Sequence, residues 1–175
     1  IGYDLIEICS NLKYSFDYET GLRQAGFLRP VGQFSMPITK IIDLTKDVEY
    51  CGNWRRNLKK ADKNNLVFEK AFPLTIEDCA DFVDIYNNML DRKSLSQRLS
   101  KEQIYALCHS GDFALYFVSH NNKRLTSTII HKHRDYAGSS FAATRQEALK
   151  LSASFFMYRE MLLNLKDEGI KAFDM

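Results

Sequence analysis

Three segments rich in apolar residues follow one another closely in the second half of the chain, at 113–119, 125–133 and 136–143. The first two are joined by the four polar residues 120–123, and the last two by Arg134-Asp135. Short polar connections between extended segments are typical of antiparallel hairpins. The pattern therefore predicts a three-stranded antiparallel meander.

Helical patterns lie on both sides of this meander. A capping box, in which Ser or Thr stands three residues before an acidic residue or Gln, marks a helix start. The last such pair predicts one long helix that Gly169 ends, followed by a strand at 170–175. The three pairs are Thr75/Asp78, Ser100/Gln103 and Thr144/Glu147.

Shorter elements are predicted nearer the N-terminus. Residues 38–44 form a β-branched strand, Thr45 caps a short helix through Tyr50, and residues 66–72 form a strand that Pro73 ends. Earlier in the chain, residues 3–9 are predicted as a strand and residues 19–25 as a helix that Gly26 ends. A loop that contains Gly32 and Pro37 follows this helix. Together these elements predict an α+β fold, a mixed sheet with helices on its faces.

A basic helix is predicted between these strands, starting at a cap on Asn53. Trp54, Leu58 and Ala61 are spaced to form an apolar seam that docks the helix. Asp62 is its only internal acidic residue. Such a helix either lies in open water or faces an anionic partner. Its bases stand four residues apart in the pairs Arg55/Lys59, Arg56/Lys60 and Lys59/Lys63.

Composition excludes several classes of protein. The 175 residues are 45% hydrophobic and 26% charged, as in ordinary globular domains, and the net charge of +2 is too small for nucleic-acid binding by the whole surface. Any anion site must therefore be local. No apolar run approaches the roughly 20 residues of a membrane span. The chain begins without Met and ends in a predicted strand, so we expect a piece of a longer protein.

The cysteines are widely separated and form no Cys-x-x-Cys pair, which argues against a zinc site and a disulfide scaffold. Reduced thiols in a cytoplasmic protein are the simple interpretation. His131 and His133 lie on the same side of one strand, but no third ligand is evident, so no metal site is predicted. The four cysteines are Cys9, Cys51, Cys79 and Cys108.

The run Trp-Arg-Arg-Asn-Leu-Lys-Lys-Ala at 54–61, with a polar break and a strand after it, resembles the opening of an acyltransferase-like domain in the Fem peptidyltransferase family. That family is similar in fold to the GNAT N-acyltransferases. The order of later elements continues the resemblance over 38–175. It implies a GNAT-like mixed, mostly antiparallel sheet flanked by helices, truncated at its C-terminus. Residues 1–37 resemble the tail of a preceding GNAT-like domain.

The resemblance implies transfer of an acyl or aminoacyl group to an amine of a cell-envelope precursor, either peptidoglycan or polysaccharide. The donor would be aminoacyl-tRNA or acyl-CoA, both substrates, so no tightly bound cofactor is expected. GNAT enzymes cradle the donor pyrophosphate in a loop containing glycines, and the matching residues 145–150 contain none. This departure counts against coenzyme A. It is compatible with aminoacyl-tRNA, and also with a domain that has lost donor binding.

Substrate-binding residues follow from the same resemblance and from charge. Arg56 and Lys60, with Trp54 beside them, would hold a phosphate of a nucleotide, lipid carrier or tRNA. Arg92 matches an arginine at a helix end in Fem-like domains; the alternative is that it only caps that helix's C-terminus and dipole. Arg145 stands where a donor phosphate would lie, or on the surface. We expect the basic helix beside a cleft between diverging strands.

Two residues are candidates for catalysis. His131 on a meander strand would act as the general base near neutral pH, or else be an ordinary strand histidine. The Asp174 carboxylate would lie near the diverging strands, or else bond a loop amide. Two non-catalytic hypotheses stay open: an RNA- or anion-binding GNAT-like domain that kept the basic helix, and a structural half-domain that packs on a missing remainder.

Overall fold

The computed structural model describes residues 15–28 and 39–175, which belong to two compact units, Ile1–Ile38 and Thr39–Met175. The first unit contains α1 (Phe16–Gln24), whose N-cap Ser15 accepts a hydrogen bond from the Tyr18 amide. The chain leaves the helix through Gly26, whose φ of +90° favours glycine. The predicted helix ended by Gly26 is confirmed. The predicted strand at 3–9, together with Gly32 and Pro37, lies outside the described residues.

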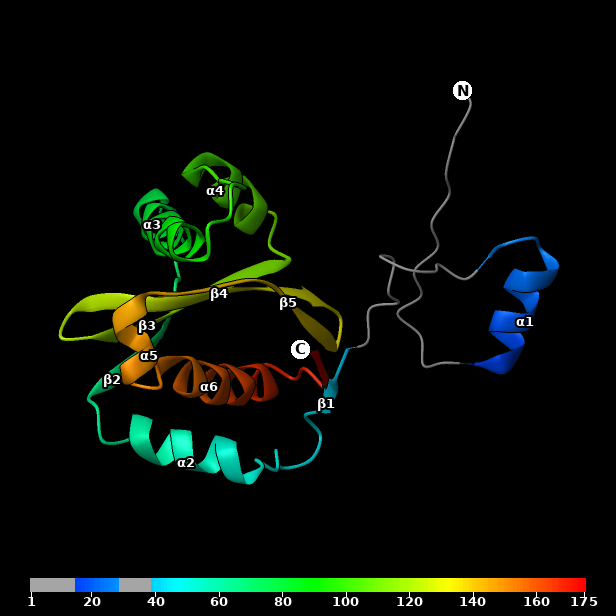
Figure 1. Ribbon diagram of the computed structural model, residues 1–175, viewed down its shortest axis with the longest axis horizontal. Helices are drawn as coiled ribbons and strands as arrows, with labels where there is room; N and C mark the ends of the chain where they lie inside the picture. The colour runs from blue at the N-terminus through cyan, green and yellow to red at the C-terminus, as the bar shows by residue number, and fades with distance from the viewer. Residues whose placement is uncertain (1–14, 29–38) are drawn as a thin grey trace. The chain divides into compact units, whose positions relative to one another are not determined.

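A six-stranded sheet forms the centre of the second unit, within the described residues (Figure 1). The strand order is β1-β6-β5-β4-β3-β2, and neighbours are antiparallel except for the parallel pair β5–β6. The predicted meander is confirmed as β3, β4 and β5. The strands are β1 (Ile41–Asp43), β2 (Leu66–Lys70), β3 (Phe113–His120), β4 (Lys123–His133), β5 (Tyr136–Thr144) and β6 (Ala172–Asp174).

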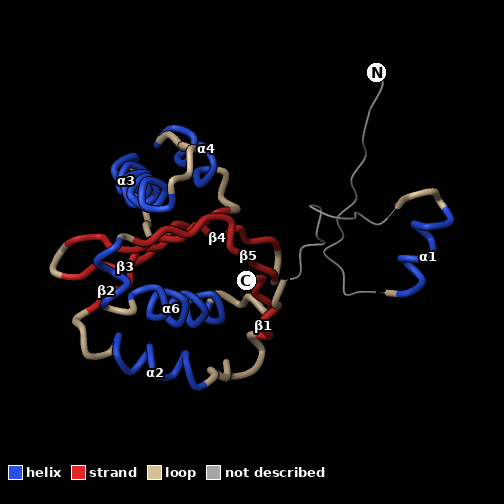
Figure 2. The backbone as a smooth tube through the Cα atoms, viewed as in Figure 1, coloured by secondary structure: helices blue, strands red, loops and turns tan. Residues whose placement is uncertain are grey.

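Helices cover both faces of this sheet (Figure 2). On one face lie α3 and α4. On the other lies α6, and α2 packs on the outside of α6. This arrangement confirms the predicted α+β class of mixed, mostly antiparallel sheet with flanking helices. The helices of this unit are α2 (Gly52–Ala61), α3 (Ile76–Lys93), α4 (Lys101–His109), α5 (Gln146–Lys150) and α6 (Ala153–Asp167).

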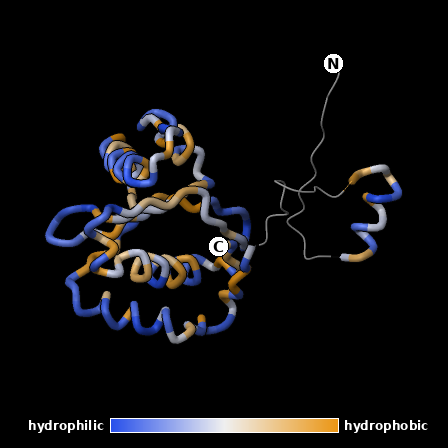
Figure 3. Tube along the Cα trace, viewed as in Figure 1, coloured by the Kyte–Doolittle hydropathy of each residue, from blue (hydrophilic) through white to orange (hydrophobic). Residues whose placement is uncertain are grey.

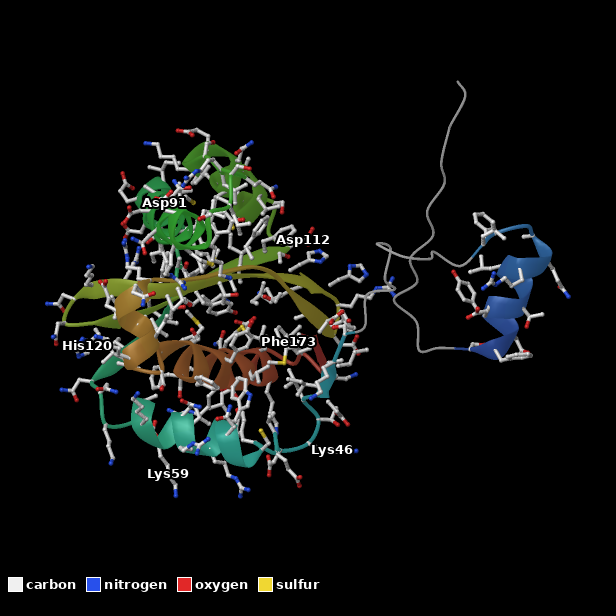
Figure 4. The ribbon with its side chains drawn as sticks, in the orientation of Figure 1. Lys46, Lys59, Asp91, Asp112, His120 and Phe173 are labelled. Atoms are coloured by element: carbon white, nitrogen blue, oxygen red, sulfur yellow. The ribbon has the colours of Figure 1, made fainter. Side chains whose placement is uncertain are left out.

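Alternation along the strands separates two cores. On β3, Tyr116 and its alternate neighbours face α6, whereas Leu115 and Phe117 face α3 and α4. Phe173 of β6 is fully buried on the α6 side, where Figure 4 shows it pointing between sheet and helix. Each large side chain buried in this way stabilises the fold by about 1.5–3 kcal/mol. Packing thus fixes the sheet from both faces.

Two of the three predicted capping boxes are confirmed, those of α3 at Thr75/Asp78 and α4 at Ser100/Gln103. The turn between β3 and β4 is tighter than predicted. Only Asn121 and Asn122 lie outside the strands, and their φ angles of 50° and 60° are left-handed. A two-residue turn of this kind matches the twist of a hairpin, and Asn tolerates it well.

The third capping box, Thr144/Glu147, is wrong. The Thr144 hydroxyl instead lies 2.8 Å from that of Thr126 and 3.0 Å from that of Ser154. Glu147 forms an ion pair with Lys123 at 2.5 Å. Thr144 and Glu147 therefore bond to residues that the fold brings close to them, and not to each other as in a capping box.

The predicted single long helix is also wrong, because α5 and α6 are separated at Ser152. This residue has a left-handed φ of 56°, and its hydroxyl donates to Asn57 Oδ1 at 3.2 Å. The Asn64 side-chain amide donates to the Leu151 carbonyl at 3.4 Å. Contacts with residues of α2 and the turn after it thus stabilise the break.

Two predictions around the start of α2 are corrected as well. The predicted helix 45–50 is absent, because the Asp43 carboxylate accepts hydrogen bonds from the Thr45 amide at 3.0 Å and hydroxyl at 2.6 Å and holds a turn. The N-cap of α2 is Cys51, not Asn53. Asn53 instead accepts a hydrogen bond from Arg56 Nη2 at 3.1 Å.

Candidate active site

The parallel pair β5–β6 adjoins an irregularity in β5. The two strands pair at Tyr136–Ala172, Ala137–Phe173 and Gly138–Asp174, and the sequence ends one residue later. Within the described residues, β5 continues to Thr144 with β4 as its only strand partner. Ile129 and Ile130 of β4 stand opposite Phe141 and Ser139, which leaves Ser140 as a bulge. A bulge twists a strand and redirects its peptide groups.

A row of side chains crosses the sheet at this point. Phe113, His131, Gly138 and Asp174 are successive partners on β3, β4, β5 and β6 and therefore share one face. The exposed His131 ring stacks on Phe113 with centroids 4.7 Å apart. A Cβ added at Gly138 would have only Asp174 atoms within 4 Å, the nearer at 3.5 Å. The row thus has a gap over Gly138, between His131 and Asp174.

Hydroxyl groups hold the Asp174 carboxylate at the edge of this gap. Tyr136 donates to Oδ2 at 2.9 Å, and Thr39 donates to Oδ1. Desolvation, together with the neighbouring Asp174 carboxylate, raises the pKa of Tyr136, so its phenol remains a donor at neutral pH. The structure therefore places the two predicted catalytic residues, His131 and Asp174, on either side of one glycine. Tyr136 was not identified from the sequence.

The predicted residues Arg92 and Arg145 converge at the other end of β5. Arg92 Nη2 donates to the Thr144 carbonyl at 3.0 Å, and Arg145 pairs with Asp84 of α3. Gly138 and Thr144 are six positions apart along the extended strand, a distance of about 20 Å. The two pairs of predicted residues therefore mark opposite ends of the same strand segment.

A polar groove of about 680 Å³ opens beside Arg145. Arg124 in its lining contacts three carboxylates, those of Glu69 at 2.5 Å, Asp78 at 2.8 Å and Asp81 at 2.9 Å. Desolvation acts to raise the pKa of Asp78, but hydrogen bonds from Thr75 and Arg124 outweigh it and hold that pKa below its usual value. Arg124, Arg145 and Lys123 are thus each neutralised by carboxylates of the domain itself.

Trp54 anchors α2 to α6. Its ring lies 4.9 Å from that of Phe155 and 6.1 Å from that of Tyr158, both edge-on. Asp62 turns toward α6 and pairs with Arg159 at 2.8 Å. The predicted apolar seam is therefore confirmed, and the carboxylate of Asp62, the C-cap residue of α2, is engaged by α6.

The bases of α2 and the turn after it form what we call the basic face. Its five members are exposed, make no ion pair with any described residue, and line a shallow groove of about 620 Å³. Figure 4 shows Lys59 pointing away from α6, and Figure 3 shows the hydrophilic character of α2. Because α6 lies between α2 and the sheet, the expectation that this helix borders the opening beside β5 is wrong. The basic face comprises Arg55, Arg56, Lys59, Lys60 and Lys63.

Neither a metal-binding cluster nor a membrane-spanning helix is found in residues 15–28 and 39–175. These ranges contain no group of three or more His, Cys, Asp or Glu side chains able to hold a metal ion. None of the helices in the same ranges is long and apolar enough to cross a bilayer.

The family profile of the acetyltransferase (GNAT) domain matches residues 51–175, which include His131, Tyr136, Gly138 and Asp174. The chain belongs to this family. The expected GNAT-like fold is thereby confirmed, and the chain carries an N-acyltransferase domain. No curated protein matches the chain by sequence.

Solved structures share this fold at low sequence identity. FemX has a TM-score of 0.72 and 12% identity, over 91% of this chain and 59% of that one. The C-terminal domain of a protein named as a lysylphosphatidylglycerol synthetase from Agrobacterium fabrum has a TM-score of 0.63 and 16% identity, over 78% and 45%. The ribosomal-protein-S18-alanine N-acetyltransferase from Escherichia coli has 0.50 and 12%, over 60% and 62%. The chain thus spans less than two thirds of each of these three structures.

Proposed function

We propose that this GNAT domain is part of a Fem-type enzyme that transfers an acyl or aminoacyl group to an amine of a cell-envelope precursor. One observation carries the proposal: the β5 bulge at Ser140 directly follows the point where Gly138 separates His131 from Asp174. Peptide groups able to polarise a carbonyl therefore lie within a few residues of side chains able to bind and deprotonate an amine.

The proposed reaction uses β5 as a template. The donor carbonyl lies beside residues that follow Gly138, where peptide N–H groups stabilise the developing oxyanion. The amine nitrogen bonds to the acyl carbon, and the bond to the donor's leaving oxygen or sulfur breaks. His131 takes the proton that the amine loses, since its imidazole is exposed and a ring nitrogen of the neutral form can accept a proton. The leaving group is protonated from solvent.

We favour aminoacyl-tRNA over acyl-CoA as the donor. Residues 145–150 lack the glycines that allow close approach of a pyrophosphate, and the nearby cations already have carboxylate partners. Arg92 and Arg145 remain proposed phosphate contacts at that end of β5. The likeness to FemX and to the named lysylphosphatidylglycerol synthetase supports an envelope acceptor. A cytoplasmic location remains part of the proposal, which the free thiols of the described cysteines support.

An assay of transfer tests this function. The full chain is incubated with alanyl-, seryl- or lysyl-tRNA, or with acetyl-CoA, and an amine-bearing muropeptide linked to uridine diphosphate. We expect transfer from a tRNA donor, and a fall of about 10²-fold or more in kcat for His131→Gln. His133→Gln is the matched control, because His133 lies two residues further on the same strand and is also exposed. Absence of transfer from every donor would refute the proposal.

A second candidate function rests on the basic face. Five exposed cations without a described counter-ion are suited to bind a phosphate-bearing partner, such as tRNA or a nucleotide-linked precursor. We propose Arg56 and Lys60 as its central contacts. Their replacement by Ala should weaken tRNA binding at low salt, whereas Lys46→Ala and Lys101→Ala, which change exposed lysines elsewhere, should not. Unchanged affinity in the double variant excludes this role.

A further inference from the structure

The gap over Gly138 is bordered by groups of different chemistry. On one side stands the stacked pair of Phe113 and His131, and on the other the carboxylate of Asp174. The backbones of β4 and β6 lie two strand spacings apart, about 10 Å. Because glycine contributes no side chain, the space between them is wide enough for one alkyl chain lying across β5.

The Asp174 carboxylate is held in place but not saturated. A carboxylate has about four lone-pair sites, two on each oxygen. Thr39 occupies one on Oδ1 and Tyr136 one on Oδ2, so each oxygen retains one site. No Lys, Arg or His among the described residues forms an ion pair with Asp174. A fixed carboxylate with free lone pairs and no cationic partner is suited to receive a cation.

Several parts of the chain must come together to make this arrangement. Thr39 precedes β1, Tyr136 begins β5, and Asp174 lies on β6, so the bonds span 135 and 38 residues. Neither donor is needed to cap a helix or close a turn. The two hydroxyl groups thus set the position of one carboxylate beside the open space.

Resting on the function proposed above, we propose that the gap over Gly138 binds the primary alkyl ammonium of the acceptor, with Asp174 as its counter-ion and Tyr136 as a positioning residue. The ammonium donates to the free lone pair of an Asp174 oxygen. The alkyl chain lies over Gly138 and against the ring of His131. The ammonium first loses one proton to His131, which releases it to solvent. The neutral nitrogen then faces the β5 bulge, where the acyl carbon lies, and His131 accepts the second proton as the new bond to carbon forms. A lysine-like amine therefore fits the site.

Binding can be tested without catalysis. The full chain, labelled with ¹⁵N, is titrated with n-butylammonium chloride and, separately, with n-butanol. We expect the ammonium, but not the alcohol, to shift the Gly138 amide and the His131 ring resonances in a saturable manner. Asp174→Asn should raise the Kd for n-butylammonium about tenfold, and Tyr136→Phe about threefold. Asp135→Asn is the matched control, since it removes an exposed carboxylate in the β4–β5 turn.

Substitutions at Gly138 that fill the gap provide a second test. Gly138→Ala places a methyl group 3.5 Å from the Asp174 Cβ, an ordinary contact, so the fold should be retained. Gly138→Leu should abolish the ammonium shifts. Equal shifts with n-butanol, or shifts that survive both Asp174→Asn and Gly138→Leu, would overturn the assignment.

The transfer assay separates this inference from the function on which it rests. Tyr136→Phe should raise the KM for the amine acceptor about threefold and leave the KM for the donor unchanged. If transfer occurs but Gly138→Leu leaves the acceptor KM unchanged, the amine site is wrong and the function stands. If n-butylammonium binds as expected but no donor supports transfer, the amine site stands and the function is wrong.

Discussion

Replacing Arg124 with Met should destabilise the domain in a manner that depends on pH. The substitution leaves Glu69, Asp78 and Asp81 facing one another without a cation, while Met retains part of the apolar stem above Phe117, whose ring centroid lies 4.0 Å from the guanidinium carbon. Breaking a buried ion pair by removing one partner costs about 3–5 kcal/mol. Here Asp81 and Glu69 are partly exposed to solvent, so we expect about 2–3 kcal/mol at pH 7.

The pH dependence follows from the pKa of Asp78. In the folded protein this pKa lies below its usual value, so the carboxylate contributes stability above its ordinary pKa and loses it as pH falls through the folded value. In Arg124→Met the repulsion among three carboxylates is relieved when they are protonated. The difference in unfolding free energy between wild type and variant should therefore begin to shrink as the pH falls below the ordinary Asp pKa, and be smaller at pH 3.5 than at pH 7.

Urea unfolding at pH 7 and pH 3.5 measures this difference. Trp54, the only tryptophan, lies between α2 and α6 and reports unfolding by fluorescence. Arg98→Met is the matched control, because Arg98 pairs with Asp91 on the exposed surface and should cost no more than about 1 kcal/mol. A loss that is equal at the two pH values, or no larger than that of the control, would show that the electrostatic reasoning is wrong.

Three further predictions concern single residues. Trp54→Ala should lower the unfolding free energy by about 2–4 kcal/mol, because three aromatic contacts are lost. Unfolding followed by circular dichroism measures this, and a change below about 1 kcal/mol would contradict it. Asp84→Asn should free Arg145 and tighten binding of inorganic pyrophosphate about tenfold by calorimetry; unchanged affinity shows that Arg145 does not reach the anion. A hydrogen bond from the Trp54 backbone amide lowers the pKa of Cys51, whereas desolvation raises the pKa of Cys79 to about 11. Cys51 should therefore react with a thiol reagent at pH 7.5 far faster than Cys79, and equal rates measured by mass spectrometry would contradict this.

Local signals in the sequence predicted most of the elements but not how they meet. The capping boxes of α3 and α4 formed as predicted. In α3 the distant Arg124 bonds Asp78 Oδ1 and leaves Oδ2 to accept from the Thr75 amide. The box at Thr144 failed because Thr126 and Ser154, 18 and 10 residues away, lie closer to its hydroxyl in the folded protein. No Gly or Pro marks the break at Ser152, which depends on contacts with α2.

Lateral contacts in a sheet are hardest to predict from sequence. Separate signals point to His131, a strand histidine, and to Asp174, through the family resemblance, and nothing in their spacing shows that both pair with Gly138. Tyr136 bonds a residue 38 positions away, and Arg124 bonds carboxylates 43 to 55 positions away. Such pairs are set by strand register, which depends on the whole core.

Pairing between β1 and β6 makes β1 depend, during synthesis, on a strand that lies far along the chain. Ile41 stands opposite Asp174 and Asp43 opposite Ala172, about 130 residues apart in the chain. The Leu44 amide likewise donates to the Lys171 carbonyl at 2.8 Å. Contacts of such high sequence separation form late, because the entropy of closing the intervening loop opposes them. On the ribosome, β1 therefore remains without its neighbour until β6 has left the exit tunnel. The hydrogen bond from Thr39 to Asp174 cannot form before that point either.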